Sequence, residues 1–413
     1  MDAAVKKKEI IACGLDVGTE KVCCLIARCR PDHRPEIIGS GYAESGGIKK
    51  GIIVNLEDAA ESIRKAGQEA ELKASVSIDW VTVGFSGDHI QSFNCRGAVA
   101  VNGRQHEVTQ EDVSQVIHAA QTVPIPAERE IIHVLPQEFF LDSRGDIRAP
   151  VGLTGERLDA DVHVVTCDSR LAQNLINAVN KAQMRVRKIV LPQLAAAHAV
   201  LTQDEKELGV ALIDIGAGTT DIALITRDAM RHSSALPVGG IHFTRDLAVG
   251  LRSTMEEAER VKREWGHVLV DHVADDEVLE VAGVAMRGAR DIPRRTACQI
   301  LRDRAIEVLE LIKDQIARSG FRDQLVSGAV FTGGGSLLEG LPTMAEQILG
   351  MPVRLGLPQG LPGLPDDLVH PVYATAVGLI LVAVQDGGEL RARTSRANSP
   401  PWIVNRFLSW VSS

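Results

Sequence analysis

The 413-residue sequence predicts a two-lobed α/β protein, because one short pattern occurs twice, far apart in the chain. In each copy an apolar strand ends in Asp-x-Gly, and a turn rich in glycine and threonine leads into a second apolar run. The strands that open the two copies are Ile10–Leu15 and Val210–Ile213. A third glycine run, Gly333–Ser336, follows the apolar strand Ala329–Phe331 and precedes a helix expected at Leu341–Leu349. Three such turns at strand ends indicate two similar halves that present matched turns to one ligand.

The second copy of the pattern provides a surface for phosphate. Asp214 stands at the end of its strand, and Gly216 and Gly218 leave no Cβ between the backbone and a ligand. Several N–H groups and the hydroxyls of two threonines can then face phosphate oxygens. The residues expected to bind phosphate here are Gly216, Ala217, Gly218, Thr219 and Thr220. Taken alone, the stretch is equally compatible with an ordinary hairpin, and the existence of the first copy favours the ligand site.

The first copy repeats the arrangement and adds a positive charge. Asp16 ends its strand, and the turn that follows contains Gly18, Thr19, Glu20 and Lys21. The lysine suits β- and γ-phosphates, because charge-assisted hydrogen bonds to phosphate oxygens are strong. Asp16 and Asp214 would repel phosphate directly, so we expect them to act through a hydrated Mg²⁺ that keeps most of its waters.

With these three turns the sequence resembles the actin-like ATPase superfamily, which includes actin, sugar kinases and heat-shock chaperones. The resemblance implies ATP and Mg²⁺ as cofactors, bound between two lobes. Glu259-Arg-Val-Lys262-Arg263 is similar to the Glu-Arg-x-Lys-Arg segment with which the chaperone ATPases hold ribose and adenine. The residues implied around the nucleoside are Glu259, Lys262, Gly334, Gly335 and Ser336. Without the other motifs, Glu259 and Lys262 would equally fit one solvated face of a helix.

Composition excludes several other classes of function. The formal net charge of −9, with no long block of Lys or Arg, argues against nucleic-acid binding. The seven cysteines form no C-x-x-C pair, so neither a zinc site nor a disulfide framework is indicated. The lysine-containing start is followed by an apolar run that is too short for a signal peptide. No stretch reaches the ~18 apolar residues that a membrane-spanning helix needs.

The middle of the chain predicts an inserted α+β subdomain at about 84–163. Strands are expected at Trp80–Gly84, Ile131–Phe140 and Ala160–Thr166, with a helix capped by Thr109. This insertion carries none of the nucleotide motifs. Together with Gly47-Ile-Lys-Lys-Gly-Ile before it and Val-Gly-Phe-Ser-Gly-Asp-His at its start, it resembles the FtsA family of bacterial cell-division proteins. That resemblance extends from about residue 9 to 384.

The motifs and breaks divide the chain into six parts. The first actin-like lobe is expected at 9–83, 164–200 and 372–385, interrupted by the insertion at 84–163. The second lobe is expected at 201–245 and 324–371, with a subdomain of its own at 246–323. A flexible linker at 386–401 and an amphipathic helix at 402–413 complete the chain. Asn55 is the expected N-cap of a helix in the first lobe, and a helix is expected at about 169–182.

The two connections between the lobes are expected at Ile189–Ala197 and Pro371–Leu379, which resemble the two connecting helices of the family. Many family members begin the first one with Glu-Pro, whose carboxylate helps to place the attacking water. Here the pair is Pro192-Gln193, so the carboxylate is missing. Gln193 is a weak candidate for orienting water, because an amide is a poor base near neutral pH. We therefore expect at most a slow ATPase, with the catalytic residue undetermined.

The second-lobe subdomain is expected to bind a partner. Helices are expected at Asp246–Arg252 and Thr254–Glu264, the latter capped by Ser253, followed by an irregular stretch at 271–293 and a long helix at about 296–318. The entry to the long helix is basic. In FtsA proteins this subdomain receives the acidic C-terminal peptide of the tubulin-like protein FtsZ, which makes Arg294 and Arg295 candidate contacts. A solvated helix face is the alternative.

The tail predicts a membrane contact. The last twelve residues contain two of the four tryptophans, on a segment too apolar to remain exposed after a soluble linker. Its cover is either a groove on a protein or an anionic lipid surface, and the reach of the linker favours lipid. The residues expected to enter the headgroup region are Trp402, Ile403, Arg406, Phe407, Trp410 and Val411. One such helix binds marginally, so self-association into a filament would strengthen attachment.

The resulting expectation is an ATP-binding, self-associating protein that tethers FtsZ filaments to the inner face of the cytoplasmic membrane at the division site. Later division proteins are expected to bind the inserted subdomain. Two alternatives remain from the sequence: a small-molecule kinase of the same superfamily, and the FtsA-like ATPase of type IV pilus assembly. No acceptor pocket or catalytic carboxylate for a kinase is evident in the sequence.

Overall fold

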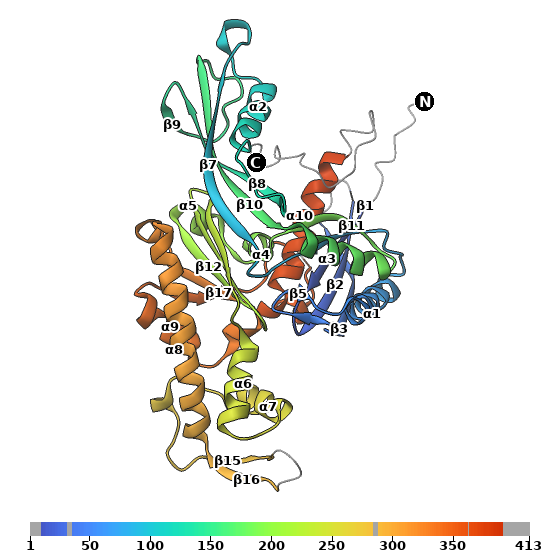
Figure 1. The fold of residues 1–413 in the computed structure, drawn as a ribbon, viewed down its shortest axis with the longest axis vertical. Helices are drawn as coiled ribbons and strands as arrows, with labels where there is room; N and C mark the ends of the chain where they lie inside the picture. The colour runs from blue at the N-terminus through green and yellow to red at the C-terminus, as the bar shows by residue number, and fades with distance from the viewer. Residues whose placement is uncertain (1–9, 31–34, 284–287, 362, 391–413) are drawn as a thin grey trace.

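The computed structural model describes residues 10–30, 35–283, 288–361 and 363–390. Two five-stranded sheets form the centres of two lobes, with one subdomain extending from the upper end and another from the lower end of the view (Figure 1). The expected membrane segment 402–413 lies outside the described residues. Within them, no helix has the length and apolar character that crossing a membrane requires.

The two central sheets have the same topology. In each, the first two strands form the antiparallel hairpin predicted by the motif, a third strand adds antiparallel on one side, and two parallel strands follow on the other. In the first lobe the order is β3 (Glu36–Glu44), β2 (Lys21–Cys29), β1 (Ile10–Val17), β6 (Trp80–Gly84) and β11 (Arg185–Val190). In the second it is β14 (Ala229–Leu236), β13 (Thr220–Thr226), β12 (Val210–Ile215), β17 (Ala329–Thr332) and β18 (Val353–Leu355). The chain therefore contains the two similar halves that the sequence predicts.

Helices cover the first sheet. The helix α1 (Leu56–Ala74) begins at Asn55, whose side chain accepts hydrogen bonds from the amides of Glu57 and Asp58, as predicted. It packs closely on β3, because a Cβ on Gly41 would lie 1.9 Å from the carbonyl oxygen of Ala66. The helix α3 (Ser169–Lys181) follows the expected range and is capped by Asp168. A short hairpin, β4 (Ile48–Lys49) and β5 (Ile52–Ile53), precedes α1.

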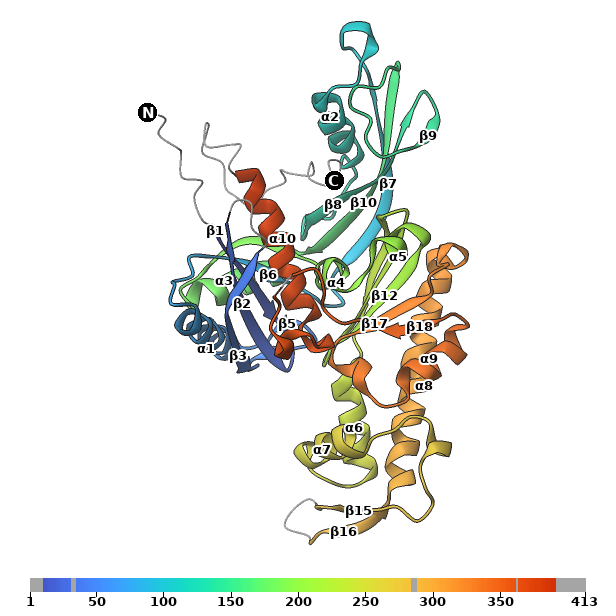
Figure 2. The same ribbon diagram turned by 180° about the vertical axis from the view of Figure 1, so that it is seen from behind.

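Two apolar helices connect the lobes at the centre of the molecule (Figure 2). They are α4 (Pro192–Val200) and α10 (Ala374–Leu390), and a Cβ on Gly378 would lie 1.9 Å from the carbonyl oxygen of Ala195. Only the small residues predicted for this crossing permit so close an approach. The helix α10 continues to Leu390, so the expectation that a linker begins at 386 is wrong by five residues. A short helix α5 (Gln203–Leu208) precedes the second sheet.

The inserted subdomain has its own four-stranded antiparallel sheet and its own core. The strand order is β7 (Gln91–Ala100), β10 (Arg157–Asp168), β8 (Arg129–Leu141) and β9 (Arg144–Ile147). The helix α2 (Gln110–Ala120) covers this sheet and begins at Thr109, which forms a capping box with Asp112. The subdomain projects away from the two lobes and, at its base, packs on β14 of the second lobe (Figures 1 and 2).

The second-lobe subdomain differs from the sequence expectation in three places. Its first helix, α6 (Gly240–Gly250), begins six residues earlier than predicted, because its first turn docks on the glycine turn of the lobe. The helix α7 (Met255–Trp265) is capped by Thr254, and not by Ser253. The stretch expected to be irregular contains the hairpin β15 (Val278–Val281) and β16 (Arg290–Pro293). The long helix α8 (Arg294–Ser319) and the helix α9 (Leu341–Leu349) follow as predicted, α8 starting two residues earlier.

Candidate functional site

A cavity of about 1060 Å³ lies between the two lobes. All three glycine turns line it, together with residues of α6 and α7. The predicted site residues that line it are Asp16, Gly18, Thr19, Glu20, Lys21, Asp214, Gly216, Ala217, Gly218, Thr219, Glu259, Lys262, Gly334 and Gly335. Residues 16 and 334 are more than 300 positions apart in sequence, so only folding brings the set together.

The first turn holds a half-buried carboxylate, Asp16, beside a half-buried cation, Lys21. The amide of Gly18 donates to the carbonyl oxygen of Lys21 at 3.0 Å, which closes the hairpin. The Lys21 ammonium donates to the carbonyl oxygen of Val372 at 2.9 Å and lies 3.8 Å from the centre of the Tyr373 ring. Burial raises the pKa of Asp16, against the opposing charge of Lys21, and burial lowers the pKa of Lys21. Each charge therefore partly stabilises the other.

The second turn has the same backbone geometry without a cation of its own. The amide of Gly216 donates to the carbonyl oxygen of Thr219 at 2.9 Å. The Asp214 carboxylate accepts a hydrogen bond from the Thr375 hydroxyl at 3.0 Å, and burial raises its pKa to about 6. The carbonyl oxygen of Gly216 accepts from the amide of Gly240 at 2.9 Å, so the first turn of α6 rests on this loop.

The third glycine run allows a close approach to the second turn. Gly333 has a φ of +80°, and a Cβ built there would lie 2.3 Å from Oδ1 of Asp214. Only glycine fits such a contact and such a backbone conformation without strain. Beside the first turn, Gly84 is the strand partner of Asp16, and a Cβ there would lie 3.7 Å from Oδ1 of that aspartate, at ordinary contact distance. The corresponding strand partner of Asp214 is Thr332, one residue before Gly333.

Two predicted ligands do not reach the cavity. The Thr220 hydroxyl is fully buried and donates to the carbonyl oxygen of Val238 at 2.8 Å. Thr219 precedes β13 and lines the cavity, whereas Thr220, the first residue of the strand, points into the protein. The Ser336 hydroxyl is also buried and donates to the carbonyl oxygen of Gly333 at 2.6 Å, which stabilises the turn itself. Neither hydroxyl therefore lines the cavity, and the nucleotide contact expected of Thr220 and Ser336 stays a prediction.

Asp221 and Ser86 line the cavity but were not predicted. Asp221 is the cross-strand partner of Asp214, so the pairing of the two strands was a signal for it. Burial and the charge of Asp214 raise its pKa to about 7. The Ser86 hydroxyl lies 2.8 Å from both carboxylate oxygens of Asp221 and bridges the first lobe to the second.

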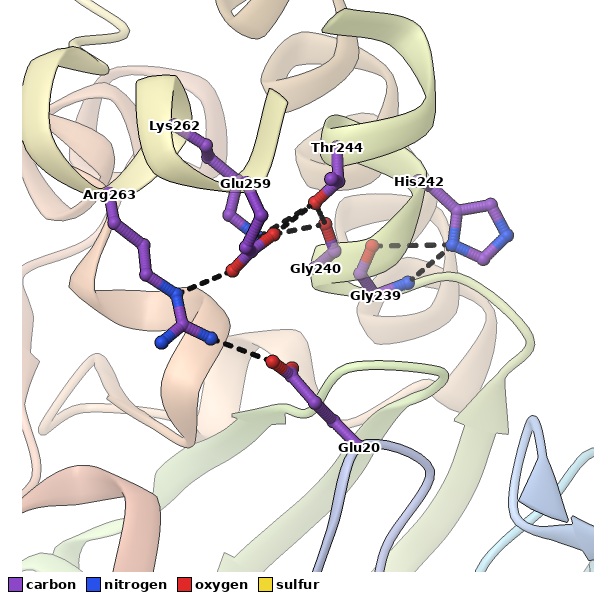
Figure 3. Close-up of polar contacts among 8 residues, drawn as sticks. All are labelled: Glu20, Gly239, Gly240, His242, Thr244, Glu259, Lys262 and Arg263. Carbon is purple, nitrogen blue, oxygen red and sulfur yellow. Dashed lines mark hydrogen bonds and ion pairs between the residues drawn. The ribbon is translucent and has the colours of Figure 1, made fainter. Parts of the chain in front are cut away.

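The far side of the cavity contains a network of charged side chains on α7 (Figure 3). Glu259 pairs with Lys262 at 2.6 Å, and its carboxylate also accepts from the Thr244 hydroxyl. Burial raises the pKa of Glu259, but the charge of Lys262 and the hydrogen bonds around it outweigh burial and lower it. Arg263 joins Glu259 at 2.6 Å and Glu20 of the first turn at 2.7 Å. The Glu259–Lys262 pair thus belongs to the cavity wall and is not a solvated helix face.

Gln193 is buried next to the cavity but does not line it. Its side chain is 1% exposed, and neither polar atom of its amide has a hydrogen-bond partner within the part of the chain that the structure describes. The preceding residue, Pro192, reaches the cavity wall instead. The order Pro-Gln therefore places a ring where the order Gln-Pro would place an amide.

Arg294 and Arg295 lie at the start of α8, away from the cavity, and both are engaged in ion pairs. Arg294 pairs with Glu277 at 2.6 Å and donates to the carbonyl oxygen of Trp265 at 2.9 Å. Arg295 pairs with Asp275. The side chain of Arg294 is 16% exposed and that of Arg295 is 38% exposed, so Arg295 is the more accessible of the two.

The cavity fits a nucleoside triphosphate with a hydrated magnesium ion. Its volume is that of a site for a ligand of this size. Asp214 and Asp221 are buried and Asp16 is half-buried, and a bound cation would offset the repulsion among these three carboxylates. Among the described residues, no group of three or more His, Cys, Asp or Glu side chains is placed to hold a metal ion directly. Binding through water, as Mg²⁺ prefers, suits this arrangement.

Comparison with known proteins identifies the family. A family model described as "Cell division protein FtsA" matches residues 211–378, and one described as "SHS2 domain inserted in FTSA" matches residues 87–166. The chain is 40% identical to the cell division protein FtsA of Pseudomonas aeruginosa, over 99% of both chains. It is 36% identical to that of Escherichia coli K12, over 100% of this chain and 99% of the other. The inserted α+β subdomain is accordingly an SHS2 domain.

Solved structures share the fold. A chain of the PilM–PilN type IV pilus biogenesis complex matches with a TM-score of 0.65 and 17% identity, over 90% of this chain and 98% of that one. MreB5 of Spiroplasma citri bound to ADP matches with a TM-score of 0.55 and 14% identity, over 94% and 99%. These likenesses show the actin-like fold that the paired turns predict. The sequence identity of 36–40% over nearly the full length of the relatives establishes that this chain belongs to the FtsA family of cell division proteins.

Proposed function

We propose that this protein binds ATP with Mg²⁺ between its lobes, self-associates, and tethers FtsZ filaments to the cytoplasmic face of the bacterial inner membrane at the division site. The observation that carries the proposal is the cavity into which both Asp-x-Gly turns open, in a chain of the FtsA family. Each lobe supplies one turn, so a ligand bound by both turns fixes the angle between the lobes. Nucleotide binding thereby becomes a means of selecting one shape for assembly.

Different residues of the cavity bind the magnesium ion, the phosphates and the nucleoside. Asp16 and Asp214 hold the waters of the magnesium ion, and the amides of the turns at Gly18–Lys21 and Gly216–Thr219 donate to phosphate oxygens. Glu259 and Lys262 contact the sugar and base, with Gly334 and Gly335 as the opposing wall. The magnesium ion neutralises phosphate charge when bound.

Hydrolysis is at most slow in this proposal. Pro192 occupies the wall position from which a carboxylate or amide would orient water, and Gln193 points elsewhere. Asp221 is the better candidate for a proton acceptor, because it lines the cavity and its pKa is raised to about 7 by burial and by Asp214.

Partner contacts involve surfaces outside the cavity. The acidic C-terminal peptide of FtsZ would bind near Arg294 and Arg295. A carboxylate of the peptide would most readily displace Asp275 from its ion pair with Arg295, because the Asp275 side chain is 87% exposed. Later division proteins would bind the SHS2 domain. The segment 402–413 would insert Trp402, Ile403, Phe407, Trp410 and Val411 into the headgroup region of an anionic bilayer, with Arg406 at its edge. Several copies on one filament would raise avidity by ~10²–10⁴.

Calorimetry tests the nucleotide site. Replacing Asp16 and Asp214 together by alanine should lower the affinity for ATP in the presence of Mg²⁺ by about 10- to 100-fold or more, since groups around a metal typically contribute that much. Replacing Asp159, a buried aspartate of the SHS2 domain far from the cavity in sequence and fold, is the matched control. Unchanged ATP affinity in the Asp16/Asp214 variant would contradict the proposal.

Vesicle sedimentation tests the membrane contact. The full chain should sediment with anionic vesicles, more strongly with ATP, and a Trp402→Glu/Phe407→Glu variant should stay in the supernatant, because charge on the apolar face opposes insertion. A variant locked against self-association should bind more weakly than the filament-forming chain. Equal binding by the wild type and the double variant would remove the membrane contact from the proposal.

The two alternatives predict other outcomes. A small-molecule kinase would consume ATP only with its acceptor, so a screen of sugars and carboxylic acids would reveal it. The pilus-assembly alternative is supported only by the shared fold with a chain of the PilM–PilN complex. Membrane localisation that survives removal of residues 401–413 would support that reading, whereas the identity of 34–40% to curated FtsA proteins supports cell division.

A further inference from the structure

An ion pair crosses the cavity between the lobes at an exposed position. Arg263, on α7 in the second lobe, donates through Nη2 to Oε1 of Glu20 in the turn of the first lobe, at 2.7 Å (Figure 3). The two residues are 243 positions apart in sequence. Both line the cavity, and their side chains are 62% and 55% exposed, so the pair lies where the cavity opens to solvent.

The second-lobe end of this pair is held in place by the cavity wall. Nε of Arg263 donates to Oε1 of Glu259 at 2.6 Å, while the other oxygen of Glu259 pairs with Lys262. Lys262 donates in turn to the Thr244 hydroxyl at 2.9 Å. Because its guanidinium is planar and fixed by Glu259, Arg263 can present its remaining N–H groups to Glu20 without ordering a free side chain.

We propose that Arg263 and Glu20 form a latch that holds the lobes closed over a bound nucleoside triphosphate and slows its release. This inference rests on the proposed function and assigns Glu20 a different role from the one expected from sequence. Glu20 is a positioning residue that binds Arg263, and not a ligand of the nucleotide. The negative charge of Glu20 would repel phosphate, which agrees with its ion pair to Arg263.

The latch acts on the rate of release. A ligand held by both turns leaves only when the lobes separate, and separation must break the Arg263–Glu20 pair. Exposed ion pairs are weak, so the expected effect of losing the pair is an increase of about two- to five-fold in the release rate. Salt screens exposed charges, so the difference between wild type and variant should shrink at high ionic strength.

A double-mutant cycle tests the latch on the full chain. Radiolabelled ATPγS is bound in the presence of Mg²⁺ and chased with excess unlabelled ATP, and its release is followed for wild type, Glu20→Ala, Arg263→Ala and the double variant. Each single variant should release it about two- to five-fold faster than wild type. The double variant should be no faster than the faster single variant, because one interaction is lost in all three.

Other outcomes overturn the inference. If the two substitutions multiply in the double variant, each residue acts on the ligand separately and there is no latch. An unchanged rate in Glu20→Ala has the same meaning, since this change leaves the Arg263–Glu259 pair intact. Arg260→Ala removes an equal charge from the outer side of α7, where Arg260 pairs with Glu257 and Glu264, and should release at the wild-type rate. Faster release in this control would assign the effect to charge alone.

The cycle separates this inference from the proposed function. A wild-type chain that binds no ATPγS would remove both. A wild-type chain that binds and releases it, with multiplicative effects of the two substitutions, would remove only the latch.

Discussion

The two Asp-x-Gly turns share a backbone and differ in charge. The first turn carries Asp16 and Lys21, two half-buried opposite charges that partly compensate each other. The second carries Asp214 and Asp221, two buried carboxylates on paired positions of one hairpin, with no cation of its own. The residue paired with Asp16 in the first hairpin is Cys23, whereas the residue paired with Asp214 in the second is Asp221, so the two similar halves differ chemically at the same position. The second turn depends more on a bound cation, and the first is closer to neutral without one.

The glycines beside Asp16 and Asp214 lie one residue apart in register, and they differ in how closely they approach the carboxylate. Gly333→Ala should destabilise the protein by about 2–4 kcal/mol, because it combines a positive φ with a Cβ only 2.3 Å from the Asp214 carboxylate. Gly84→Ala, beside Asp16, should change the free energy of unfolding by less than about 1 kcal/mol, because its nearest contacts are 3.4–3.7 Å away. Chemical denaturation of both variants measures the difference. Equal losses would mean that the two turns are packed alike.

The pH dependence of stability should come mainly from the second turn. The pKa of Asp221 is raised to about 7 by burial and by Asp214, so the folded protein binds more protons than the unfolded chain between about pH 4 and pH 7. Stability without ligand therefore falls as pH rises through this window. Asp221→Asn removes that loss and should stabilise the ligand-free protein by roughly 1–3 kcal/mol at pH 8, with little effect near pH 4.

Unfolding in denaturant at several pH values measures this effect. Asp16→Asn provides the comparison from the first turn. It should not stabilise the protein at pH 8, because it leaves the half-buried Lys21 without its carboxylate partner. A flat difference between wild type and Asp221→Asn across the whole pH range would contradict the assignment.

The serines that support the two turns should differ least. Ser86 donates to the carboxylate of Asp221 at 2.8 Å, whereas Ser45 donates to the carbonyl oxygen of Gly18 at 2.8 Å. Hydrogen bonds to charged groups are stronger, so Ser86→Ala should cost about 1.5–3 kcal/mol and Ser45→Ala about 0.5–1.5 kcal/mol. Thermal denaturation at pH 8, where Asp221 is ionised, resolves the two. At pH 5, where Asp221 is protonated, the two losses should converge.

Short patterns in the sequence were sufficient to predict the fold and the backbone turns that form the site. Short apolar runs and the Asp-x-Gly signature predict both hairpins, and the small residues of the connecting helices predict their close crossing. Most of the predicted nucleotide ligands line the cavity, because glycine at a strand end has few other uses. These properties are local, since each depends on a few consecutive residues.

The tertiary structure alone decided which side chains face the ligand. Thr220 and Ser336 carry suitable hydroxyls, but inside the protein these hydroxyls donate hydrogen bonds to the backbone carbonyl oxygens of Val238 and Gly333. Asp221 and Ser86 meet only after the two lobes have assembled, as do Glu20 and Arg263. A sequence specifies where a turn forms through neighbouring residues, whereas the partner of a side chain on that turn depends on residues far along the chain. That is why the glycine turns could be read from the sequence, and the charges that meet across the cavity could not.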